Sequence, residues 1–119
     1  MYQLTVREKF DSAHKLEDYP GPCKNIHGHS FLVDVTVESK VLNSMFIVMD
    51  FKELKTIIKM MTVELDHHYI NEVLSIANAT AEYLAKWFYY GLKNKLPRGI
   101  NIVKVTVFES PDCGATYYE

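Results

Sequence analysis

The sequence predicts an α+β fold: a four-stranded antiparallel sheet with two helices on one face, in the order β-β-α-α-β-β. Three observations lead to this prediction. Apolar and polar residues alternate in segments near both ends of the chain, which is the period of a half-buried strand. Two segments in the middle instead repeat apolar residues at helical spacing. The 119 residues show no internal repeat and no linker, so we expect a single domain over residues 1–119.

The first two strands are predicted at residues 2–9 and 31–38. Each has an apolar residue at every second position, so one face can be buried while the other faces solvent. These apolar residues are Tyr2, Leu4 and Val6 in the first strand and Phe31, Val33, Val35 and Val37 in the second. Residues 17–22 contain proline and glycine and predict a loop between the strands.

The first helix is predicted at residues 51–65, and the second begins after Thr80. Asp50 followed by Glu53 resembles a capping box, in which the two side chains satisfy free N–H groups of the first turn. Thr80 is a suitable N-cap for the second helix, and the Pro-Arg-Gly sequence downstream ends it. The apolar stripes are Phe51, Leu54, Ile57, Ile58, Met61 and Leu65 in the first helix and Ala81, Leu84, Ala85, Phe88 and Leu92 in the second.

Two further strands complete the sheet. Residues 100–108 are rich in β-branched side chains and predict the third strand, and residues 115–118 predict a short fourth strand after a turn at 111–114. A sheet of this kind has two open edges, and pairing edge to edge in a closed ring would cover them. We therefore expect a homo-oligomer.

The composition excludes several classes of protein. The formal net charge of −2 gives no basic excess to neutralise a phosphate backbone, which argues against a dedicated nucleic-acid binder. No apolar run approaches the roughly 20 residues of a membrane helix, and the first residues lack the apolar region of a signal peptide. We expect a soluble cytoplasmic protein with a small-molecule or protein partner, in which Cys23 and Cys113 are free thiols.

All five histidines lie in three short segments. His27 and His29 are two positions apart, so in a strand both imidazoles point to one face. His14 ends the first strand and can supply a third nitrogen from a neighbouring backbone. Three imidazoles fit Zn²⁺ in a catalytic site, which keeps one coordination position open for water or substrate. The alternative is that the His-Gly-His segment is a solvent-facing pair without a metal.

Cys23, four residues before His27, has three alternative roles. It can be a fourth ligand of a closed metal site, a buried apolar residue, or a reactive thiol beside an open coordination position. The spacing alone leaves the three open.

Two acidic residues are candidates for chemistry. Asp66 adjoins His67 just after the first helix, and an aspartate that accepts a hydrogen bond from an imidazole orients it for acid–base catalysis. The alternative is a solvated helix C-terminus. Glu109 ends an otherwise apolar strand, where a carboxylate can accept two parallel N–H bonds from the edge of a guanine or a pterin. The alternative is an exposed strand end.

Taken together, these residues resemble the 6-pyruvoyl-tetrahydropterin synthase family, and within it the 6-carboxy-tetrahydropterin synthase branch of queuosine and archaeosine biosynthesis. The likeness covers nearly the whole chain in six segments that follow the family order. These are residues 10–16 (FDSAHKL), 23–31 (CKNIHGHSF), 49–55 (MDFKELK), 65–71 (LDHHYIN) and 78–82 (NATAE), and Glu109. The three residues between Cys23 and His27 are like the carboxy branch, whereas Ala79 departs from the proline that is usual in the family.

The resemblance implies a role for each candidate residue. It implies that His14, His27 and His29 are zinc ligands, with one zinc ion per subunit. It implies that Cys23 is the catalytic thiol, with Asp66 and His67 as its acid–base partner. It also implies that Glu109 anchors the pterin in a pocket that includes Thr80.

The resemblance also implies the reaction and the assembly. The reaction converts 7,8-dihydroneopterin triphosphate to 6-carboxy-5,6,7,8-tetrahydropterin and releases acetaldehyde and triphosphate, without nicotinamide or flavin. The implied fold is the tunnelling fold (T-fold), in which three subunits close a barrel and two such rings stack into a homohexamer with sites between subunits.

Three alternative functions are compatible with the same residues. Two are enzymes of the same fold, one producing 6-pyruvoyl-tetrahydropterin and one cleaving the side chain to 6-hydroxymethyl-dihydropterin. The third is a non-enzymatic module in which zinc and the histidines hold subunits together.

Overall fold

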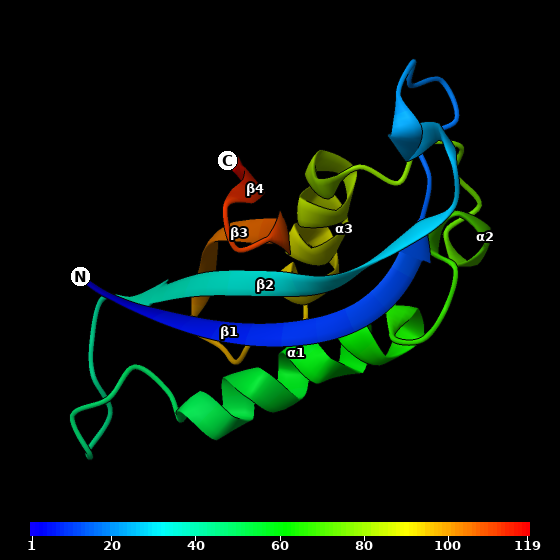
Figure 1. Cartoon of the computed structure of the whole chain (residues 1–119). Helices are drawn as coiled ribbons and strands as arrows, with labels where there is room; N and C mark the ends of the chain where they lie inside the picture. Colours follow the sequence, from blue (N-terminus) through cyan, green and yellow to red (C-terminus); the bar gives the residue numbers. More distant parts are fainter.

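The computed structural model describes residues 1–119 and forms one antiparallel sheet in the strand order β1-β2-β3-β4. The strands are β1 (Tyr2–His14), β2 (His27–Ser39), β3 (Asn101–Ser110) and β4 (Cys113–Tyr118). The helices are α1 (Phe51–Leu65), α2 (Ile70–Val73) and α3 (Ala81–Lys93), with a short 3₁₀ turn, η1 (Pro22–Lys24), between the first two strands. Figure 1 shows α1 running along β1 and α3 lying against β3 and β4.

Side-chain alternation divides the sheet into a buried face and an open face. In β1 the even positions Val6 and Phe10 are buried, and in β2 the odd positions from Phe31 to Val37 are buried. The antiparallel register places Phe10 opposite Phe31, and their rings stack with centroids 5.0 Å apart. Phe88 of α3 packs on Phe10 from above the sheet, so the core lies between the sheet and the helices.

Both long helices begin at capped residues. Asp50 accepts a hydrogen bond from the backbone N–H of Lys52 at 2.7 Å, and Thr80 accepts one from the N–H of Tyr83 at 3.1 Å. The predicted helix at 51–65 and the Thr80 cap are confirmed. None of the helices is long and apolar enough to cross a membrane.

The strands are longer than the sequence predicts. β1 continues from residue 9 to His14, and β2 begins at His27 rather than at Phe31. The added residues are mostly polar or glycine, so they lack the apolar alternation that identifies a strand, but they continue the ladder between β1 and β2 to the pair His14 and His27. The four-residue helix α2 was also not expected.

Candidate metal centre and active site

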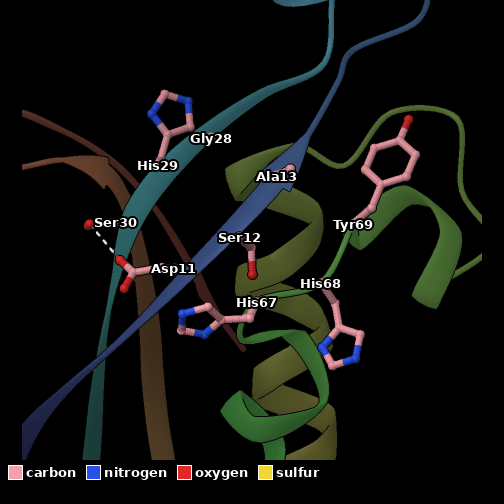
Figure 2. Close-up of a pocket in the computed structure, with 9 residues that line it drawn as sticks. All are labelled: Asp11, Ser12, Ala13, Gly28, His29, Ser30, His67, His68 and Tyr69. Carbon is pink, nitrogen blue, oxygen red and sulfur yellow. Dashed lines mark hydrogen bonds between the residues drawn. The ribbon is translucent and has the colours of Figure 1, made fainter.

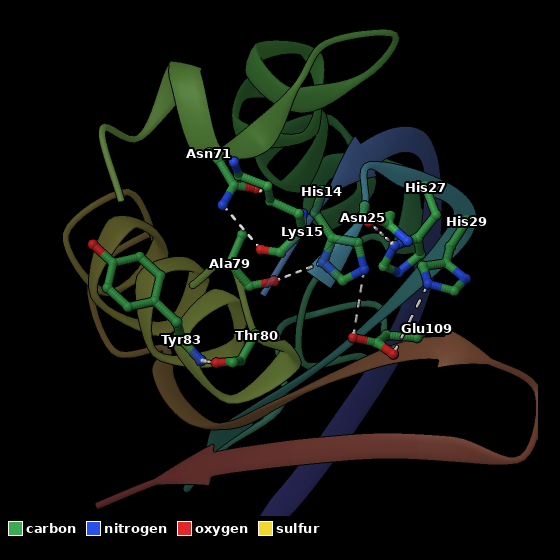
Figure 3. A network of polar contacts seen from close by, with 10 residues as sticks. All are labelled: His14, Lys15, Asn25, His27, His29, Asn71, Ala79, Thr80, Tyr83 and Glu109. Atoms are coloured by element: carbon green, nitrogen blue, oxygen red, sulfur yellow. Dashed lines mark hydrogen bonds and ion pairs between the residues drawn. The ribbon is translucent and has the colours of Figure 1, made fainter. Parts of the chain in front are cut away.

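Three imidazoles gather at the end of the sheet beyond the core. His14 on β1 and His27 and His29 on β2 occupy positions of the same parity as Phe10 and Phe31, so all point to the helix side of the sheet. Their ring centroids lie 4.5 to 5.0 Å apart, and one nitrogen of each ring lies within 4.8 Å of the others. Figure 3 shows the three rings facing one region, as the His-x-His spacing predicts.

Backbone carbonyls orient two of these rings. The Nδ1 atom of His14 lies 2.7 Å from the carbonyl oxygen of Ala79, and that of His27 lies 2.7 Å from the carbonyl oxygen of Asn25. A carbonyl only accepts hydrogen bonds, so Nδ1 carries the proton and Nε2 carries the free lone pair. A histidine in this tautomer can bind a metal through the lone pair on Nε2.

Two of the Nε2 atoms have no partner within the protein. The Nε2 atoms of His14 and His29 are buried and make no hydrogen bond, although buried polar atoms are nearly always satisfied. Burial lowers the pKa of His14, partly offset by the hydrogen bond to Ala79, so its imidazole is held neutral. A set of three imidazoles, two of them with buried Nε2 atoms that lack a partner, fits a divalent cation such as Zn²⁺.

Glu109 lies beside this cluster. It continues the buried-face positions of β3, two residues after Val107, at a register irregularity between Phe108 and Ser110. Its two carboxylate oxygens lie 3.8 Å from Nε2 of His14 and 4.0 Å from Nε2 of His29 (Figure 3). The sequence predicts Glu109 as a site residue, and the structure adds its distances to the two histidines.

A pocket of about 410 Å³ opens next to Glu109. Its lining includes Cys23 from η1, Thr80 from the start of α3 and Glu109 from β3. Cys23 is a free, half-buried thiol, and its backbone carbonyl accepts a hydrogen bond from the N–H of Leu16 at 2.8 Å. The structure therefore brings the predicted thiol, carboxylate and threonine to one cavity.

Asp66 and His67 form a pair at the edge of β1. The His67 Nδ1 atom lies 3.0 Å from Asp66 Oδ2, and the backbone of Asp11 holds both residues. The Asp11 N–H donates to Asp66 Oδ1 at 2.9 Å, and the Asp11 carbonyl accepts from the His67 N–H at 2.6 Å. Figure 2 shows the His67 ring close to Asp11, whose carboxylate accepts a hydrogen bond from Ser30.

The environment of Asp66 favours its charged form. The N–H of Asp11 and then the side chain of His67 lower the pKa of Asp66 below its usual value. His67 itself adopts a left-handed backbone conformation, with φ of 59°, which a non-glycine residue rarely does without local support.

Within one chain, the acid–base pair and the thiol lie in different cavities. His67 lines a separate pocket with Asp11, Ser30 and His68, and Cys23 is not among its residues. The expected partnership of Cys23 with Asp66 and His67 is therefore not formed inside a single chain.

Two supporting residues were not identified from the sequence. Asn71 on α2 accepts from the N–H of Lys15 and donates to the carbonyls of Lys15 and Ala77, each at 2.9 Å, which ties the chain after His14 to the segment before Ala79 (Figure 3). Asp11 acts mainly through its backbone. Neither role has a sequence signal, because both depend on contacts between distant segments.

Comparison with known proteins identifies the family. The family described as 6-pyruvoyl tetrahydropterin synthase matches residues 3–119. A 6-carboxy-5,6,7,8-tetrahydropterin synthase from Synechocystis sp. is 33% identical over 123 residues, covering 99% of this chain and 94% of the relative. A dihydroneopterin monophosphate aldolase from Pyrococcus furiosus is 30% identical over 114 residues, covering 94% and 93% of the two chains.

The solved structures support the same assignment at the level of the fold. The Caenorhabditis elegans 6-pyruvoyl tetrahydropterin synthase superposes with a TM-score of 0.85 at 24% identity, over 99% of this chain and 95% of that chain. This match confirms the predicted four-stranded T-fold subunit. The chain is therefore a lyase-type enzyme that belongs to the 6-pyruvoyl tetrahydropterin synthase family.

Proposed function

We propose that the chain is a zinc-dependent 6-carboxy-5,6,7,8-tetrahydropterin synthase that acts on 7,8-dihydroneopterin triphosphate. The names of relatives such as the Synechocystis enzyme support the reaction. The observation that carries the proposal is a cluster of three histidines, two of which have unsatisfied buried Nε2 atoms and lie beside Glu109, whose pocket also holds a thiol.

His14, His27 and His29 would hold the metal through their Nε2 atoms. The donor set favours Zn²⁺, because three imidazoles and an open position are typical of catalytic zinc. Bound zinc would supply Lewis-acid chemistry, stabilising negative charge on the substrate's side-chain oxygens when a neighbouring proton is removed.

Glu109 and Thr80 would recognise the pterin ring. The Glu109 carboxylate can accept the ring N3–H and the 2-amino group as two parallel hydrogen bonds. The Thr80 oxygen already accepts the N–H of Tyr83, but its O–H proton is still available to a ligand in the pocket. With this edge of the pterin bound, the reactive side chain of the substrate would lie at the opposite end of the ring system.

Cys23 is the proposed base, and Asp66 with His67 the proposed proton shuttle. The two lie in different pockets of one chain, so we propose that Cys23 meets Asp66 and His67 of a neighbouring subunit in a homohexamer. Asp66, which accepts a backbone N–H on one oxygen and faces His67 with the other, would fix the ring for proton transfer.

The substrate supplies its own reducing equivalents. Proton transfers from side-chain carbons to the ring convert the dihydropterin to a tetrahydropterin, and elimination releases triphosphate. Water then cleaves the bond between the first and second side-chain carbons: its oxygen enters the carboxyl group, and the remaining two carbons leave as acetaldehyde. No nicotinamide or flavin is needed for this balance.

A second candidate is supported by the aldolase relative. The Pyrococcus furiosus protein is named a dihydroneopterin monophosphate aldolase, and it is 30% identical to this chain. An aldolase would cleave the same carbon–carbon bond without reducing the ring. It would release 6-hydroxymethyl-dihydropterin and would keep the phosphate on the departing fragment.

Product analysis separates these functions. Purified zinc-loaded protein is incubated in turn with 7,8-dihydroneopterin triphosphate and the monophosphate, and the products are identified by mass. We expect 6-carboxy-tetrahydropterin, acetaldehyde and triphosphate. A 6-hydroxymethyl product would instead identify an aldolase, a 6-pyruvoyl product would identify a synthase of the other branch, and no turnover of either substrate would contradict an activity on these pterins.

A further inference from the structure

We propose that Glu109 is an exchangeable ligand of the metal: its carboxylate binds the ion when the pterin pocket is empty and moves to the pterin ring when substrate enters. This inference rests on the proposed function and adds a second role to a residue expected only to hold the pterin. In this inference, the fourth coordination position of the metal is open only when substrate is bound.

The distances place Glu109 close to the coordination shell. Ligands of a tetrahedral zinc ion lie about 3.3 Å from one another, which follows from bond lengths of ~2.0–2.1 Å. The two carboxylate oxygens lie 3.8 and 4.0 Å from Nε2 of His14 and His29. Glu109 is not within 4.8 Å of all three ring nitrogens, so its side chain must rotate to bring one oxygen to ligand distance. Such rotamer changes of a partly exposed side chain take picoseconds to nanoseconds.

The electrostatics favour the same contact. The Nε2 atoms of His14 and His29 are buried without partners, and Glu109 is the carboxylate that faces both. A cation among the histidines would neutralise this carboxylate, which is only 30% exposed and is otherwise costly to leave unpaired. No backbone or side-chain donor of the protein holds Glu109 in place, so it is free to change partner.

The backbone around Glu109 suits a residue with two positions. The ladder between β3 and β4 is irregular between Phe108 and Ser110, so Glu109 has no partner on β4. Such irregularities redirect a side chain without disturbing the rest of the sheet. On the other side, Glu109 lines the pocket with Thr80 and Cys23, so the same carboxylate can reach either the metal cluster or the pocket.

The two roles exclude one another by position. A carboxylate whose two oxygens both face the N–H groups of a pterin edge cannot at the same time place an oxygen at ligand distance from the ion. Substrate binding would therefore remove a negative ligand from the ion and raise its Lewis acidity at the moment when the substrate hydroxyls arrive. Without substrate, the ion would be closed to other ligands.

Metal affinity and cobalt spectra of the substrate-free protein test the ligand role directly. Zn²⁺ affinity is measured by competition with a chromophoric chelator, and the visible absorption of the Co²⁺-substituted protein reports ligand number and type. For Glu109→Gln we expect at least a tenfold loss of Zn²⁺ affinity and a changed Co²⁺ spectrum. The control is Glu82→Gln, which changes the other carboxylate of the pocket and should alter neither.

Exchange is then tested by adding neopterin, a pterin that already lacks the phosphate, to the Co²⁺ proteins. The wild-type spectrum should change on binding, and Glu109→Asp, which keeps the carboxylate on a shorter side chain, should retain part of that response. Glu109→Gln with wild-type Zn²⁺ affinity and spectrum would overturn the inference, as would an unchanged wild-type spectrum when neopterin is bound. A failed product assay would contradict the proposed function but not the substrate-free result, so the two failures are distinguishable.

Discussion

Two of the three histidines of the metal cluster are oriented by single backbone carbonyls. Ala79 contributes its carbonyl to His14, and Asn25 does the same for His27, and each leaves Nε2 free to bind a metal. Ala79 is fully buried, and its contact with His14 uses a main-chain oxygen. The interaction therefore does not depend on the side chain at this position.

Replacing Cys23 with alanine tests whether the thiol reacts or binds the metal. We expect Cys23→Ala to keep one zinc per chain and its unfolding midpoint, because the three histidines supply the ligands, but to lose at least 100-fold in kcat, the usual contribution of a positioned base. Zinc content and turnover are measured on the same preparation. Loss of zinc in this variant would instead make Cys23 a ligand.

Asp66 should make the stability of the protein depend on pH. Its pKa in the folded protein is lowered, so the stabilisation is present above its unfolded pKa and is lost as the pH falls through the folded pKa. Asp66→Asn should therefore be less stable than wild type near pH 7, with a difference that shrinks as the pH falls below about 4. Urea unfolding of both proteins near pH 7 and at a pH below about 4 measures this difference in the free energy of unfolding. A difference that does not change with pH would contradict the prediction.

At the scale of the elements, the apolar periodicity predicted the segments of helix and strand that face the core. It predicted the helix at 51–65 and the central parts of the strands, because these positions face the core. It ended β1 at residue 9 and started β2 at Phe31, because most of the residues that extend the strands, apart from the core residue Phe10, carry the site rather than the core. The strand ends are therefore both the least predictable and the functional parts of these elements.

The position of Glu109 was predictable in principle. Val105 and Val107 face the core, so strand alternation places Glu109 on the same face as the histidines of β2. The irregularity that frees it from β4 was not predictable, because it depends on how the turn after Ser110 closes the hairpin.

The caps of the two long helices offer a matched pair of substitutions. Thr80→Ala and Asp50→Ala each remove one N-cap hydrogen bond, so each should cost about 1 kcal/mol in the free energy of unfolding. Only Thr80 lines the pterin pocket, so only Thr80→Ala should also raise KM, and Thr80→Ser should restore both properties. Equal KM values for the two alanine variants would remove Thr80 from substrate binding.

At the scale of the whole molecule, the proposed catalytic residues of one chain are divided between two pockets. Cys23, Thr80 and Glu109 line one pocket, whereas His67 lines the other with Asp11 and His29. In the proposed function, one chain would therefore supply two halves of a site. An assembly that joins the edge of one sheet to the next would unite them and would also cover the open edges of β1 and β4.

Complementation tests this arrangement. Cys23→Ala and His67→Ala should each be inactive alone, but co-expressed chains should recover roughly a quarter of wild-type activity, because random mixing leaves that share of shared sites with both residues intact. Activity is compared with each variant expressed separately. Recovery no greater than the sum of the two variants would mean that each site is built within one chain.

The most direct test of the account is zinc-edge X-ray absorption of the zinc-loaded, substrate-free protein. Three histidine ligands with Cys23 outside the coordination shell predict nitrogen and oxygen neighbours at ~2.0–2.2 Å and no sulfur neighbour. A sulfur shell at ~2.3 Å would contradict the account, because the thiol would then close the metal site and could not act as the base.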